Sequence, residues 1–139
     1  GNTVYNTVDL APAGTLAAGQ YLVVGSSAVM VPPTALMIVF SGGQQDRVQN
    51  GAPDGAALVN TMTSQLIDAL SYEGSITAVS IPNVGTVSLV EGTALPAAVA
   101  DSNTNPGSLC RLPDGTDTDN AASDWAFSAT ITPGAANVP

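Results

Sequence analysis

The chain has 139 residues, the length of one ordinary domain, and a formal net charge of -9, with two Arg, eleven carboxylates and neither Lys nor His. Affinity for nucleic acids comes mainly from several Lys and Arg contacts with phosphates, so this composition excludes nucleic acid as a partner and disfavours anionic membrane surfaces. Because there is no His or Lys, and the one Cys has no His with which to form a thiolate pair, the sequence predicts that the protein is not an enzyme.

Short apolar runs separated by Gly, Pro, Asn and Asp predict an all-β fold, since helical periodicity is nearly absent. Residues 4–10 alternate between apolar and polar, which indicates a strand with one wet face. Residues 21–24 and 35–40 are apolar on both sides and are expected in the core. Residues 65–72 fit one and a half helical turns or a strand, and we predict a strand. The other predicted strands are residues 56–59, 86–90, 108–112 and 125–131.

Turn residues divide these segments. Asn50-Gly51 and Asp54-Gly55 are dipeptides typical of turns, and residues 93–106 and 114–124 are expected to be long loops. About eight strands without any linker-like block predict one domain, residues 1–139, built as a sandwich or barrel. The longest apolar run, residues 35–40, is far shorter than the roughly 20 residues of a membrane-spanning helix, so no membrane span is expected.

Several sequence blocks carry a resemblance to a known family: GTLAAGQYLVVG at 14–25, NGAPDGAALV at 50–59, DALSYEG at 68–74, and RLPDGTDTDN at 111–120 with DW at 124–125 and TPGAAN at 132–137. In this order the blocks resemble the lamin tail domain family in its bacterial form. The resemblance implies an immunoglobulin-like β-sandwich and the role of a non-catalytic interaction module in secreted or surface proteins. We therefore expect an extracellular or cell-surface structural protein.

The sequence departs from that family at its start. Members usually open with strands that contain an Asn-Glu motif and a Glu-Leu-Tyr-Asn-like motif, and nothing here matches them. Those strands are absent from this sequence, carried by a second chain, or replaced by a neighbour through strand addition. We expect an open sheet edge near residues 4–10. A partner protein, or further copies in a homo-oligomer or filament, would then fill this edge.

Four aspartates lie close together in residues 114–124, which we call the aspartate loop: Asp114, Asp117, Asp119 and Asp124. Carboxylates of this kind suit calcium, so these four residues are the candidate metal ligands. The sequence does not require a cofactor, and calcium is the only ion that it suggests. The spacing does not reproduce the EF-hand loop. The alternative is that the Asp side chains bond their own backbone in Asx turns. If calcium binds, the alternative function is a calcium-stabilised accessory domain of a secreted enzyme.

Three further side chains flank this loop. Arg111 is expected to form a structural salt bridge with Asp114 or Asp124. Trp125 is expected to plug the core under the loop, the alternative being a ring on which a ligand stacks. Cys110 cannot form an internal disulfide because the sequence has no second Cys. We expect it to be a small buried hydrophobic residue.

Overall fold

The computed structural model describes residues 2–42, 47–49, 51–100 and 104–139. Within these residues the chain is all-β, as predicted, and helix is limited to two short segments, the 3-10 turn η1 (Ala11–Ala13) and the single turn α1 (Ala121–Asp124). The strands are β1 (Leu22–Gly25), β2 (Leu36–Val39), β3 (Asp54–Asn60), β4 (Gln65–Tyr72), β5 (Val79–Ile81), β6 (Gly85–Val87), β7 (Ser108–Arg111) and β8 (Trp125–Ser128).

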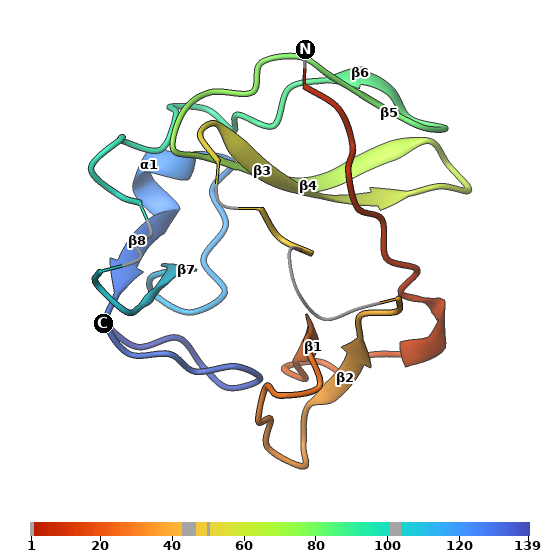
Figure 1. Cartoon of the computed structure of the whole chain (residues 1–139), viewed down its shortest axis with the longest axis vertical. Coiled ribbons are helices and arrows are strands. Elements are labelled where there is room, and N and C mark those ends of the chain that lie inside the picture. The colour runs from red at the N-terminus through yellow and green to blue at the C-terminus, as the bar shows by residue number, and fades with distance from the viewer. Residues whose placement is uncertain (1, 43–46, 50, 101–103) are drawn as a thin grey trace.

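The strands pair two by two (Figure 1). β1 and β2 are parallel, whereas β3–β4, β5–β6 and β7–β8 are antiparallel. The described residues therefore form four two-stranded sheets, and the immunoglobulin-like sandwich stays a prediction. A single two-stranded sheet is marginally stable in water, so contacts between these pairs must hold the fold together.

The hairpin of β3 and β4 lies at the centre of those contacts. Successive side chains of a strand point to opposite faces. On one face, Ala69 of β4 belongs to a small core with Ile76, Val79 and Leu89. On the other face, Leu70 belongs to a second core with Leu95 and Ala121. β4 is therefore the strand that both cores cover, and its bounds, residues 65–72, are those that the sequence predicts.

The prediction of a strand over residues 4–10 is wrong. The only pairing of this region within the described residues is an isolated parallel bridge between Thr3 and Ser80. Figure 1 shows the segment crossing β3 and β4 instead of running alongside them, so a ladder of backbone hydrogen bonds cannot form. Side chains fix it instead, because the Tyr5 hydroxyl donates to both carboxylate oxygens of Asp54 at 3.2 and 3.1 Å, and Asn6 donates to the Arg47 carbonyl at 2.9 Å.

The runs at 21–24 and 35–40 form β1 and β2, but they are not the core. Their side chains are mostly half-buried, and Val39 is exposed. The reason is their position, since this pair lies at the end of the molecule opposite β5 and β6, away from both core clusters (Figure 1). Apolar composition predicted the strands, while the burial depended on neighbours that are not adjacent in sequence.

The remaining predicted strands are confirmed with adjusted bounds, and residues 56–59 lie within β3. The predicted loop at 114–124 ends in the helical turn α1. The predicted strands at 108–112 and 125–131 are the slightly shorter β7 and β8, and 86–90 corresponds to β6, whose partner β5 was not predicted. Asp54-Gly55 does not form a turn but begins β3, while Asn50 of the other predicted turn lies outside the described residues.

Candidate functional site

The densest group of charged side chains surrounds Arg111, the last residue of β7. Its guanidinium donates through Nη1 and Nη2 to the two carboxylate oxygens of Asp68 on β4, at 3.1 and 2.9 Å. Nη2 lies 3.4 Å from Glu91, and Nη1 lies 3.3 Å from Asp117. The Arg111 Cζ atom lies 5.2 Å from the centroid of the Trp125 ring on β8, within cation–π range. One cation thus joins β4, β7, β8 and two loops.

This arrangement corrects the predicted salt bridge. Arg111 bonds Asp68, Glu91 and Asp117, and not Asp114 or Asp124. Position in the sheet explains the difference, because the side chain of the last β7 residue reaches toward β4. A carboxylate on β4 is then nearer than most of those in the loop that follows Arg111.

Glu91 is the most enclosed carboxylate of the group, with a side chain 15% exposed. Its pKa is raised, first by burial and then by the charges of Asp68 and Asp117, while the hydrogen bond from the Ala69 amide and the charge of Arg111 oppose the rise. The Ala69 N–H donates to Glu91 Oε1 at 3.0 Å. Glu91 therefore bonds the backbone of β4 and the Arg111 guanidinium at the same time.

Asp124 is buried and serves the aspartate loop itself. Its carboxylate accepts hydrogen bonds from the Thr118 amide at 2.8 Å, the Thr118 hydroxyl at 2.7 Å and the Asn120 amide at 3.4 Å. The bond from the Thr118 amide is the main cause that lowers the pKa of Asp124. This side chain bonds nearby backbone, as the alternative interpretation of the loop predicts.

Asp114 connects the loop to distant segments. It accepts a hydrogen bond from the Tyr21 hydroxyl at 2.5 Å and another from the Asn137 amide at 2.8 Å. The Asn137 bond is the main cause that lowers the pKa of Asp114. This carboxylate therefore ties the chain before β1, the loop and the C-terminal segment together.

The four predicted metal ligands thus lie in one loop but bond different donors. Asp117 pairs with Arg111 and accepts from the Asp119 amide at 3.2 Å, and Asp119 has a left-handed backbone with φ of 54°. Over the part of the chain that the structure describes, no group of three or more Asp, Glu, Cys or His side chains is arranged to hold a metal ion. The calcium site stays a prediction.

The predictions for Cys110 and Trp125 agree with the structure. Cys110 is buried, and burial raises the pKa of its thiol. Trp125 packs against the core of Leu70, Leu95 and Ala121, so its ring is a core contact as well as a surface for Arg111.

Sequence reasoning missed Asp68 and Glu91 as partners of Arg111. Asp68 is 43 residues away from Arg111 in sequence and Glu91 is 20. The scarcity of cations could have predicted that Arg111 pairs with several carboxylates, because the chain has only two Arg and eleven carboxylates. Nothing in the spacing could say which of the eleven they are.

A shallow depression of about 370 Å³ lies beside Arg111, with Tyr21, Asp68, Asp114 and Trp125 in its lining. Two donors near it, Arg111 Nε and Trp125 Nε1, are buried and have no hydrogen-bond partner within the described residues. The carboxylates around the depression bond the guanidinium, backbone amides or hydroxyls. This geometry suits holding segments together, because each charged group is bonded by neighbours from another part of the chain.

Comparisons of the chain with protein-family models, curated proteins and solved structures found no match. The resemblance to the lamin tail domain therefore rests on the sequence blocks alone. Among the described residues, no helix has both the length and the apolar character needed to cross a membrane.

Proposed function

We propose that the chain is a non-catalytic structural or interaction module, acting outside the cell or at its surface, that completes its sheets with a strand from another polypeptide. The observation that carries the proposal is the pairing pattern, because the described strands form four two-stranded sheets. Each outer strand of such a sheet has a row of backbone groups without a ladder partner. Such edges are templates for a further strand.

The ion cluster supports a structural role. Arg111 on β7 pairs with both Asp68 on β4 and Glu91 in a loop, and the other well-bonded carboxylates, Asp114 and Asp124, accept from backbone amides. A catalytic acid or base needs a free position next to a substrate. Charged groups that are occupied by neighbours serve cohesion better than chemistry.

The immunoglobulin-like sandwich and the lamin tail type of module are part of this proposal. Three or more strands with a covered face are needed for a sheet to be stable on its own. Strands added to the present pairs would enlarge them toward the two sheets of a sandwich. The added strand comes from a partner protein or from a further copy of the chain, which would give a homo-oligomer or filament.

Amide hydrogen exchange combined with light scattering tests the proposal. In dilute solution, edge amides such as that of Ala57 should exchange quickly, while amides of the β3–β4 ladder are protected. At high concentration, or with a partner strand bound, the same edge amides should become protected. A compact monomer at every concentration, with its edge amides already protected by its own chain, would refute the proposed function.

A further inference from the structure

The middle of β3, from Ala56 to Leu58, is uncovered on both faces, whereas Asp54 at the start of the strand is buried. Its residues Ala56, Ala57 and Leu58 are all exposed, and consecutive residues of a strand point to opposite faces. The paired residues of β4 differ, because Ala69 and Leu70 are buried in the two core clusters. Both cores therefore cover β4, and neither covers β3 over Ala56 to Leu58.

Hydrogen bonds show which backbone groups of β3 point outward. The Gly55 N–H donates to the side chain of Asp54 at 2.8 Å, and the Ala69 N–H donates to Glu91. Neither amide serves the β3–β4 ladder, so the pairs Gly55–Ser71 and Ala57–Ala69 are the non-hydrogen-bonded pairs of the alternating antiparallel pattern. The N–H and C=O of Ala57, in the middle of the strand, consequently face away from β4.

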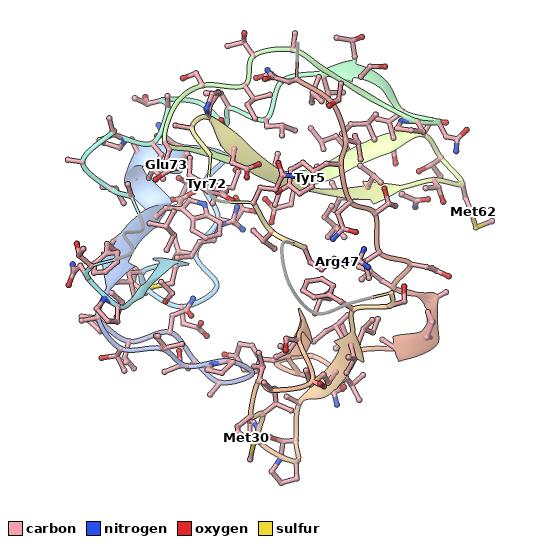
Figure 2. All side chains as sticks on the ribbon, in the orientation of Figure 1. Tyr5, Met30, Arg47, Met62, Tyr72 and Glu73 are labelled. Atoms are coloured by element: carbon pink, nitrogen blue, oxygen red, sulfur yellow. The ribbon has the colours of Figure 1, made fainter. Side chains whose placement is uncertain are left out.

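This edge carries little protection against pairing. Natural edges are usually guarded by charged residues, Pro or bulges. From Gly55 to Asn60 the strand has no charge and no Pro, and the one irregularity is the shift of register between Leu58 and Val59. Figure 2 shows Met62 at the tip of the hairpin, pointing away from the molecule, where it is 95% exposed. The regular edge runs over Asp54 to Leu58.

The charge of the chain indicates what can occupy the edge. The net charge is -9, and both cations are engaged, Arg111 with three carboxylates and Arg47 with the Ser41 carbonyl. A second copy would bring the same negative charge. Five edge residues also span only about 17 Å, which at a sheet thickness of about 10 Å buries far less than the ~1,200 Å² of a stable interface between folded proteins.

We propose that the free edge of β3 binds a short extended segment of another protein, with Lys or Arg at its flanks. Main-chain hydrogen bonds to Ala57 hold the segment, and its cationic flanks are drawn to the acidic surface. This inference rests on the proposed function and narrows it, because it names the strand that receives the partner and the charge of that partner.

The test uses synthetic peptides and the whole chain. The probe alternates Val and Thr and has two Lys at each end. One control replaces the Lys residues with Glu, and a second carries N-methyl groups on alternate backbone nitrogens, so that it lacks the donors for a new ladder. Ala57→Pro removes the outward N–H at the centre of the edge, and Ala57→Ser is the matched variant that keeps it.

The Lys-flanked peptide should bind at least about tenfold more tightly than the Glu-flanked peptide at low salt, and the difference should shrink at about 0.5 M salt. N-methylation and Ala57→Pro should each weaken binding at least about tenfold, while Ala57→Ser leaves it unchanged. If Ala57→Pro does not fold, the N-methyl peptide still decides the point, since it leaves the protein unaltered.

Other outcomes separate this inference from the proposed function. Equal binding of Lys-flanked and Glu-flanked peptides overturns the assigned partner charge. If neither peptide binds although the Ala57 amide exchanges freely, the inference fails and the proposed function stands. The same holds if a second copy of the chain occupies the edge and Ala57→Pro abolishes that association. Protection of the Ala57 amide by its own chain overturns both.

Discussion

Replacing Arg111 with Met tests the view that this cation holds the fold together. The variant keeps an unbranched side chain that can still contact Trp125 but loses the bidentate pair with Asp68 and the contacts with Glu91 and Asp117. Three carboxylates that shared one cation are then left to repel one another. We expect a marked loss in the free energy of unfolding at neutral pH.

The exposure of the partners sets the size of that loss. Removing one member of a fully buried ion pair costs about 3–5 kcal/mol, whereas exposed pairs are worth about 0–1 kcal/mol. The side chains of Asp68 and Asp117 are 34% and 44% exposed, so water screens them, while Glu91 is only 15% exposed. We expect Arg111→Met to cost about 2–4 kcal/mol, mostly through Glu91, which corresponds to a fall in Tm of about 6–14 °C.

The control is Arg47→Met, which changes the net charge equally but removes a cation hydrogen-bonded to the Ser41 carbonyl. It should cost about 1 kcal/mol or less. Burial already raises the pKa of Glu91, and loss of the Arg111 charge raises it further. Protonation of Glu91 therefore removes an unpaired charge from the variant. The difference in free energy of unfolding between Arg111→Met and the wild type should narrow as pH falls through the pKa of Glu91. Denaturant melts would refute the reasoning if both variants cost the same, or if the gap did not change with pH.

Three further predictions concern the aspartate loop. Gly92→Ala should cost about 2–3 kcal/mol, against about 1 for Gly19→Ala, because both glycines have positive φ but a Cβ at Gly92 would lie 2.6 Å from the Asp119 carbonyl while Gly19 has open space. Equal losses in urea melts would contradict this. Asp124→Asn should lower the free energy of unfolding at neutral pH. The pKa of Asp124 is lowered in the folded chain, so its carboxylate stabilises the fold above the unfolded pKa, and this stability is lost as pH falls through the folded pKa. The variant and the wild type should therefore be equally stable in acid. Calcium should raise the Tm if the loop binds it, and a melting curve that excess EDTA leaves unchanged would favour the Asx-turn interpretation.

Alternation in the sequence predicted how side chains point better than it predicted pairing. Over residues 65–72 the pattern gave a strand with the observed bounds. Over residues 6–10 it also fits, because Asn6, Val8 and Leu10 are half-buried and the residues between them are exposed, whereas Val4 is exposed although the pattern placed it on the buried face. An extended segment alternates in this way whether or not a neighbouring strand runs beside it. The ladder depends on direction relative to that neighbour, which the local sequence does not contain.

The candidate site shows the same limit. The sequence identified Arg111 as a cation with a structural role and Trp125 as a core ring, since scarcity and residue type are local properties. It placed the Arg111 partners in the adjacent loop, because proximity in sequence was the only guide. Asp68 is brought to Arg111 by packing of β4 near β7, a consequence of the tertiary arrangement.

The ion cluster and the proposed edge belong to the same hairpin, and this relation gives the cluster a role in binding. Asp68, which Arg111 holds, is the direct partner of Leu58 across the β3–β4 ladder. β4 is thus fixed by two cores and an ion cluster, while β3 is bonded to β4 on one side and open on the other. A receiving edge that is held in place loses little conformational freedom when a strand is added, so more of the new hydrogen bonding appears as affinity. The hairpin carries two aspartates, Asp54 and Asp68, and neither Lys nor Arg, so it favours a cationic strand over a second copy of the chain.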